Sequence, residues 1–247
     1  MKHTARTILA AATLGLIGAS ALSAQTPARG SARQAMSAAD SAVLVLVERA
    51  AAGYSSERSL RATFVQTILT PRTGDVQTAR GEFLQRGTSQ FAFAFTEPAG
   101  DRIIADGEVL WLYLPSMSPG QVLKVPRAAG AGLDLATSLL RAPRERYTVR
   151  SLGDTLVAGQ TLRRLTLTPR TDDAPFRTAE LWIEPADAVI RRLVLVEPLG
   201  LVRTIDFTRV RVGGVISDAA FVFTVPDGVR VIDQAAMLGG SVPPKKP

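Results

Sequence analysis

The chain has 247 residues, no Cys, one His, and 29 Lys and Arg residues against 22 Asp and Glu, which gives a formal net charge of +7. Because Cys is absent and His3 lies in a segment that we expect to be removed, disulfides, thiolate metal sites, Cys nucleophiles and His general bases are excluded. The Arg residues are scattered and aromatic residues are few, so we expect no nucleic-acid partner; the charge fits either a location near an anionic membrane or an Arg-rich solvated surface.

Residues 1–24 have the pattern of a secretory signal peptide. Two basic residues, Lys2 and Arg6, precede an apolar run at residues 8–22, and the small residues Ser23 and Ala24 follow it. We expect cleavage after Ser23 or Ala24 and a soluble, exported product. No Cys follows the run, so a lipid-modified signal is excluded. An uncleaved membrane anchor is the less favoured alternative, because the run is short and a cleavage site follows it.

The first predicted element of the exported chain is a helix. Residues 25–36 show no periodicity and are expected to be a disordered lead-in. Ser37 and Asp40 then have the spacing of a capping box, ahead of apolar residues at helical intervals. We therefore predict a helix over residues 38–52, with an apolar side made of Val43, Leu46, Val47 and Ala50.

Strands follow the helix. Their predicted ranges are 60–69, 76–85, 90–95, 102–106, 109–114 and 121–125. In the third strand, Phe91, Phe93 and Phe95 alternate with small or polar residues, so their rings share one face. Asp106 and Gly107 supply the turn of a hairpin between the next two strands. The aromatic face must be covered, and what covers it decides whether it is a core or a ligand cavity.

The pattern changes near residue 133. Leu133, Ala136, Leu139 and Leu140 fall on one side of a short amphipathic helix that we expect to end at Pro143. A second series of strands is predicted at residues 147–152, 161–168, 178–183, 189–196, 201–212 and 221–224. Many short strands with few helices predict a mainly β (α+β) fold, with a strongly curved antiparallel sheet or incomplete barrel. We expect one domain over residues 37–235 and a flexible tail at 236–247.

Several segments, in order and spacing, resemble the periplasmic outer-membrane lipoprotein carrier family, LolA, from about residue 40 to residue 233. The resemblance implies an unclosed antiparallel β-barrel with a lid of short helices over an apolar cavity. It further implies a non-enzymatic, monomeric periplasmic carrier without cofactor or metal. Such a carrier holds the acyl chains of lipoproteins between an inner-membrane release transporter and an outer-membrane acceptor. The segments are residues 60–66, 81–86, 91–98, 106–107 with Trp111 and Tyr113, and 221–229.

The resemblance also assigns roles to residues. Arg86 matches the arginine that hydrogen-bonds lid-loop carbonyls and latches the empty cavity shut, although Gly87 follows it where the family usually has Pro. The family's later Asp-x-x-Gly-Gln turn appears here only as residues 197–201, which puts a partner surface there in doubt. The residues expected to line the acyl-binding cavity are Phe64, Phe83, Phe91, Phe93 and Phe95, and those of the structural motif are Asp106, Gly107, Trp111 and Tyr113.

Each assignment has a plainer alternative. The Phe residues can fill an ordinary core, which is the preferred interpretation without the resemblance, and Arg86 alone is a solvated charge. A carboxylate-based hydrolase is a further alternative, but turn chemistry explains the pairs Asp106 with Glu108 and Asp172 with Asp173. Within the same fold, a protein that binds another lipid, or that senses lipoproteins without transporting them, remains open.

Overall fold

The computed structural model describes residues 36–55, 59–126, 139–172 and 174–235. Its strands are β1 (Ser59–Thr70), β2 (Asp75–Arg86), β3 (Gln90–Glu97), β4 (Arg102–Ala105), β5 (Val109–Tyr113), β6 (Gln121–Pro126), β7 (Tyr147–Val157), β8 (Gln160–Pro169), β9 (Thr178–Ile183), β10 (Ile190–Val196), β11 (Val202–Val212) and β12 (Arg230–Asp233).

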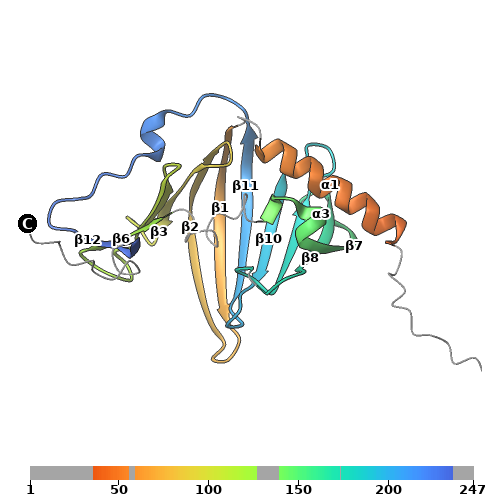
Figure 1. Cartoon of the computed structure of the whole chain (residues 1–247), viewed down its shortest axis with the longest axis horizontal. Helices are drawn as coiled ribbons and strands as arrows, with labels where there is room; N and C mark the ends of the chain where they lie inside the picture. Colours follow the sequence, from red (N-terminus) through yellow and green to blue (C-terminus); the bar gives the residue numbers. More distant parts are fainter. Residues whose placement is uncertain (1–35, 56–58, 127–138, 173, 236–247) are drawn as a thin grey trace, which may run out of the picture. The chain divides into compact units, whose positions relative to one another are not determined.

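In the described part of the chain, these strands form one unclosed sheet in the order β12-β6-β5-β4-β3-β2-β1-β11-β10-β9-β8-β7 (Figure 1). Neighbouring strands are antiparallel, except that β12 runs parallel to β6. The prediction of a mainly β, unclosed sheet with few helices is therefore confirmed, with the parallel pair as an exception. The two free edges are β12 and β7.

Tight turns connect the long hairpins. Between β1 and β2, the amide of Gly74 donates to the carbonyl of Thr70 (2.9 Å). Between β4 and β5, the amide of Asp106 donates to the carbonyl of Val109 (3.2 Å), and Gly107 has φ 116°. That backbone angle favours glycine, which is why the Asp-Gly pair marks this turn in the sequence.

The predicted strand at residues 221–224 is wrong. Residues Asp218–Phe221 form the 3-10 helix η1, in which the Ser217 side chain accepts from the amide of Ala219. Phe221 is buried against Ala92 and Ile104 of the sheet. The alternating apolar residues of this segment pack across a face of the sheet, and the same alternation is typical of a strand. The strand that does form, β12, begins only at Arg230.

Helix α1 (Ala38–Ser55) is longer than predicted, and its predicted cap is present. The amide of Asp40 donates to Ser37 Oγ (3.0 Å). At the same end of the helix, Asp40 Oδ1 accepts from the amide of Ser151 in β7 (2.7 Å), which ties α1 to the edge strand. All four residues of the predicted apolar side are buried: Val43, Leu46, Val47 and Ala50.

The second predicted helix is described only in part. Leu133 and Ala136 lie outside the described residues, whereas Leu139 and Leu140 are helical and buried. Pro143 does not end this helix directly; it occupies the first turn of the separate short helix α3 (Pro143–Arg146), where its missing N–H costs nothing.

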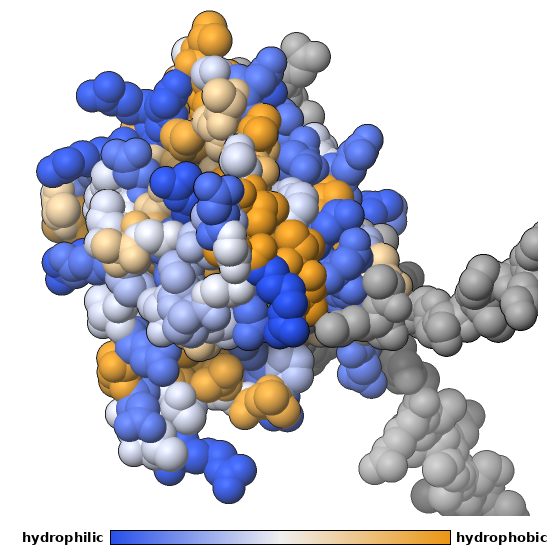
Figure 2. All heavy atoms as spheres, turned by 90° about the vertical axis from the view of Figure 1, so that its left-hand side faces the viewer, coloured by the Kyte–Doolittle hydropathy of each residue, from blue (hydrophilic) through white to orange (hydrophobic). Residues whose placement is uncertain are grey.

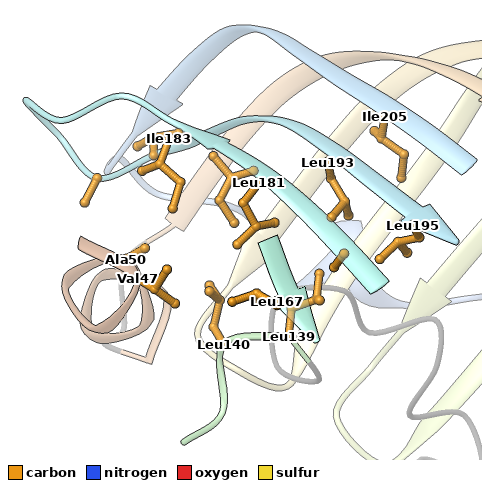
Figure 3. Packing of buried hydrophobic residues seen from close by; sticks show 14 of the residues in the cluster. Val47, Ala50, Leu139, Leu140, Leu167, Leu181, Ile183, Leu193, Leu195 and Ile205 are labelled. Atoms are coloured by element: carbon orange, nitrogen blue, oxygen red, sulfur yellow. The ribbon is translucent and has the colours of Figure 1, made fainter. Parts of the chain in front are cut away.

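One face of the sheet carries most of the core. We call it the α1 face, because the apolar side of α1 is buried there together with the inward residues of the strands. In Figure 3, Val47 and Ala50 of α1 lie beside Leu140, and Leu181, Leu193 and Ile205 project from the neighbouring strands. A smaller cluster on the opposite, outer face contains Ala92, Ile104, Ile216 and Phe221.

The outer face is crossed near β2 to β5 by residues 213–229, which we call the strap. Figure 2 views the molecule from the left-hand side of Figure 1, where hydrophobic surface lies among hydrophilic surface. The strap exposes apolar side chains of its own, since Val215 and Val222 are 90% and 61% exposed.

Candidate functional site: an aromatic row on the α1 face

Five Phe residues predicted to line a cavity lie together on the α1 face. The rings of Phe64 and Phe93 meet edge to face, with centroids 5.2 Å apart, and those of Phe83 and Phe93 are 4.6 Å apart. Phe91 and Phe95 adjoin Phe93 at 6.1 and 6.4 Å. These separations fall within the favourable range for aromatic pairs. We call the set, with Phe207, the aromatic row.

Strand register produces this row. Phe83 in β2 lies opposite Phe93 in β3, and Phe64 in β1 lies opposite Phe207 in β11. Phe207 is 5.5 Å from Phe83, centroid to centroid, and was not predicted. Its only sequence signal was a place in an apolar strand, because the pairing of β1 with β11 joins positions far apart in the chain.

Gly81 allows two strands to bring their rings together. It lies opposite both Phe64 and Phe95. A Cβ atom at this position would be 2.1 Å from the carbonyl oxygen of Ala94, so only glycine fits the backbone approach. The rings of Phe64 and Phe95 then lie 5.2 Å apart at nearly a right angle. The glycine predicted only as part of a motif is thus a packing requirement of the row.

Exposure rises along β3. Phe64, Phe83, Phe91 and Phe93 are 2–7% exposed, whereas Phe95 and Phe207 are only partly buried. The row is therefore closed at the Phe91 end and more accessible at the Phe95 end. An apolar ligand that binds to the row would first contact the half-buried rings of Phe95 and Phe207.

Arg86 lies at the end of β2 and projects to the outer face. Its Nη1 donates to the carbonyl of Ile216 (3.2 Å) and forms an ion pair with Asp218 (2.6 Å). Its Nε donates to Gln90 Oε1 (2.8 Å), and its guanidinium lies 5.0 Å from the centre of the Phe221 ring. These contacts hold the strap on the sheet. Residues 127–138, which include the start of the second predicted helix, lie outside the described residues, and the lid latch stays a prediction.

The structural motif lies on the same outer face. Asp106 Oδ1 accepts from the amides of Glu108 and Val109 (2.9 and 2.8 Å), and its Oδ2 accepts from Trp111 Nε1 (3.3 Å). Phe223 of the strap stacks on Trp111, with centroids 5.4 Å apart, and lies 5.6 Å from Tyr113. Asp106 is therefore committed to turn and ring contacts, and the two aromatic side chains hold the strap.

Among the described residues, no three His, Asp or Glu side chains converge in a way that would hold a metal ion. Asp173, one of the carboxylates weighed for a hydrolase, lies outside the described residues. In the same described ranges, no helix combines the length and apolarity needed to cross a membrane.

A small pocket lies beside the Phe91 end of the aromatic row. It lies where the last turns of α1 meet the start of β1, the end of β11 and the turn before β10. The residues that line it are Ala50, Gly53, Ser59, Leu60, Gln85, Asp187, Ala188, Val189 and Val212. Sequence reasoning did not identify this pocket.

The sequence model of the outer membrane lipoprotein carrier protein LolA matches residues 55–224, more than half of the chain. The chain belongs to the LolA family. The matched range contains the aromatic row and Arg86, while most of α1 and all of β12 lie outside it. The resemblance inferred from the sequence motifs is confirmed.

Individual LolA relatives are distant in sequence. The outer-membrane lipoprotein carrier protein of Methylobacillus flagellatus is 24% identical over 188 residues, covering 76% of this chain and 89% of the relative. The protein of the same name from Leptothrix cholodnii is 28% identical over 178 residues, covering 72% and 80%. A crystal structure of an uncharacterized conserved protein from Thermus thermophilus shares the fold, with a TM-score of 0.51 at 17% identity, covering 78% of this chain and 99% of that one.

Proposed function

We propose that this protein is a periplasmic carrier that binds the acyl chains of lipoproteins on the α1 face and transports them from the inner membrane to an outer-membrane acceptor. The observation that carries the proposal is the aromatic row, in which six phenyl rings share one face of an unclosed sheet and two remain partly accessible. Membership of a family named for lipoprotein carriage supports it.

The energies of such a site suit reversible binding. Burial of an acyl chain contributes about 0.8 kcal/mol per CH₂, so about a dozen methylenes give an upper limit on the order of 10 kcal/mol. A closed state held by charge-assisted hydrogen bonds offsets roughly 1.5–3 kcal/mol of this for each bond that must open. The balance lowers the net affinity, and a carrier requires this because its cargo must be handed on.

The carrier role needs no chemistry beyond binding. The charge of the chain suits work beside anionic membranes. A release transporter in the inner membrane and an acceptor at the outer membrane are the partners that the role requires, and the carrier acts between them as an exported monomer.

A test combines displacement of a fluorescent fatty-acid analogue with native mass spectrometry of the protein purified from the periplasm. We expect displacement by acylated peptide and a co-purifying acylated protein. A bound free lipid without acylated protein would favour the same-fold alternative that binds another lipid. A purified protein that carries no ligand and does not bind the fluorescent analogue would show that the aromatic row is an ordinary core.

A further inference from the structure

Gln85 places an unusual polar atom in the pocket at the closed end of the row. The side chain is 4% exposed, and within the described part of the chain its Oε1 is the buried side-chain atom that lacks a hydrogen-bond partner. Leaving a buried acceptor unpaired costs free energy comparable to a lost hydrogen bond. Such an atom requires a specific reason, and a ligand that donates to it is one.

The orientation of this amide group is fixed. Gln85 Nε2 donates to the carbonyl of Gly87 (3.0 Å), and a carbonyl can only accept. The amide nitrogen must therefore face Gly87, and the amide oxygen must face away from it. The free acceptor is a consequence of the local geometry of the β2 end.

The other polar side chains of the pocket already make hydrogen bonds within the protein. Ser59 Oγ donates to the carbonyl of Gly214. Asp187 Oδ1 accepts from the amide of Val189 (2.8 Å), and its Oδ2 accepts from Arg191 (2.6 Å). Among the side-chain oxygens of the lining, Gln85 Oε1 is thus the one that makes no hydrogen bond in the described part of the chain.

The pocket adjoins the aromatic row through the register of three strands, because Leu60 and Gln85 line it and Phe91 is the next residue in the same cross-strand line. Gln85 lies opposite Leu60 in β1 and opposite Phe91 in β3, in one cross-strand line on the α1 face. Phe83 lies two residues earlier on the same strand and face. An apolar chain that reaches the Phe91 end of the row therefore comes within one cross-strand step of this amide oxygen, and a few polar groups in an apolar site typically fix the orientation of its ligand.

We infer that this pocket binds the N-acyl end of the cargo: a long acyl chain lies on the aromatic row, and the amide N–H that joins it to the rest of the ligand donates to Gln85 Oε1. The inference rests on the proposed carrier function and adds the part of the cargo that is recognised. A triacylated lipoprotein has one amide-linked chain and two ester-linked chains, and only the amide-linked chain brings an N–H donor. The site therefore distinguishes one of the three chains.

The test uses the full exported protein and two probes with the same acyl chain, N-methylpalmitamide and methyl palmitate, which differ by an amide N–H in place of an ester oxygen. We expect the wild type to bind the amide about tenfold more tightly than the ester. In Gln85→Leu, this preference should disappear while ester binding is kept. The matched control is Gln66→Leu, on the same face of β1, whose Oε1 already accepts from Arg203 (3.0 Å); it should keep the preference.

The outcomes separate the two proposals. Equal binding of amide and ester by the wild type would overturn the inference and leave the carrier function intact. Binding of neither probe would contradict the carrier function itself. Native mass spectrometry of loaded protein distinguishes the sources of the amide: an acylated protein assigns it to a lipoprotein, a small N-acylated lipid assigns it to that lipid, and a ligand with only ester-linked chains contradicts the inference.

Discussion

Among the rings of the aromatic row, exposure decides what a substitution tests. Phe64 and Phe91 are 2% and 5% exposed, and truncating such a core residue costs about 3–5 kcal/mol of stability. A binding defect in those variants would be confounded with unfolding. Phe95 and Phe207 are only partly buried, so the carrier function is best tested through them.

We predict that Phe95→Glu keeps the fold and weakens the binding of acyl chains about tenfold or more, because a carboxylate beside the ligand must be desolvated. Displacement of a fluorescent fatty-acid analogue measures the loss, and thermal unfolding checks the fold. The control is Thr96→Glu, which puts the same charge at the next, exposed position of β3. Unchanged binding by Phe95→Glu would remove the row from the site.

A second prediction concerns Arg86. We expect Arg86→Leu to remain folded, because the ion pair with the 86%-exposed Asp218 contributes only about 0–1 kcal/mol. Strap residues 213–229 should become more susceptible to proteolysis, since their bond from the guanidinium is lost. If Arg86 is also the latch, the variant accepts lipoprotein but passes it on poorly.

Transfer from preloaded carrier to an acceptor measures the latch, and Asp218→Asn is the matched control because it loosens the strap while the guanidinium stays. Poor transfer in Arg86→Leu but not in Asp218→Asn would support the latch. Wild-type transfer by Arg86→Leu would leave the arginine with the strap alone.

What the sequence predicts at this scale depends on whether the signal is local. The shared face of Phe91, Phe93 and Phe95 follows from alternation within one strand and was predicted. Phe207 joins them through the register of β1 with β11, and Gln85 has its free oxygen because of a carbonyl two residues away. Neither contact can be inferred from the type of residue alone. The contacts of Arg86 with the strap were not predictable for the same reason.

At the scale of elements, the first turn of α1 forms a hydrogen bond with β7, an edge strand of the sheet. The Ser151 N–H of β7 donates to the Asp40 carboxylate (2.7 Å). An edge strand presents unpaired backbone groups that invite pairing with other chains, and natural sheets cover or disrupt such edges. Beside this hydrogen bond, the pairing of β7 with β8 is also irregular, between Ser151 and Gly153. Helix and irregularity together protect one end of the sheet.

This contact predicts a pH dependence. The hydrogen bond from the Ser151 amide, followed by the bond with Ser37, holds the pKa of Asp40 below its ordinary value of 3.8. A lowered folded pKa means that the stabilisation is present above the unfolded pKa and is lost as pH falls through the folded pKa. The wild type should therefore exceed Asp40→Asn in unfolding free energy at neutral pH, and the difference should vanish in acid.

Urea unfolding of both proteins at pH 7 and at a pH below the ordinary carboxyl range measures this difference. Asp227→Asn, an exposed position in the strap, controls for the change in net charge. A difference between wild type and Asp40→Asn that persists unchanged in acid would contradict the role of the carboxylate.

The elements show where pattern reading succeeds and where it fails. The hairpin at Asp106 and Gly107 was predicted because its turn chemistry is local. Residues 221–224 were misread because an alternating apolar segment has the same period whether it pairs in a ladder or packs across a sheet. Phe223 stacks on Trp111 without belonging to a strand, and only the tertiary structure distinguishes the two cases.

For the whole molecule, the proposed transport role requires a chain that leaves the inner membrane. We predict an exported product that begins near Ala24 or Gln25, because a charged start, an apolar middle and small residues form a cleavable signal. Intact-mass measurement of periplasmic material checks this. A full-length, membrane-retained chain would contradict the shuttle, since an anchored carrier cannot cross to the outer membrane.

The fold as a whole was predictable because many weak local signals agree, and the family resemblance combined them. Strand ranges mostly differ by a few residues at their ends, and β7 runs on to Val157 past an irregularity of register at Gly153, which has φ 83°. The parallel addition of β12 to β6 was not predictable, because it depends on where the strap ends after crossing the outer face.

The unclosed sheet has one further consequence. In a closed barrel, the number of strands and their stagger fix the radius, so the lumen has one width. In this protein no ladder joins β12 to β7, and the described strands can change their curvature without breaking a backbone hydrogen bond. Under the proposed carrier function, a sheet whose curvature can change would accommodate acyl groups of different bulk, whereas a closed barrel of fixed radius would not.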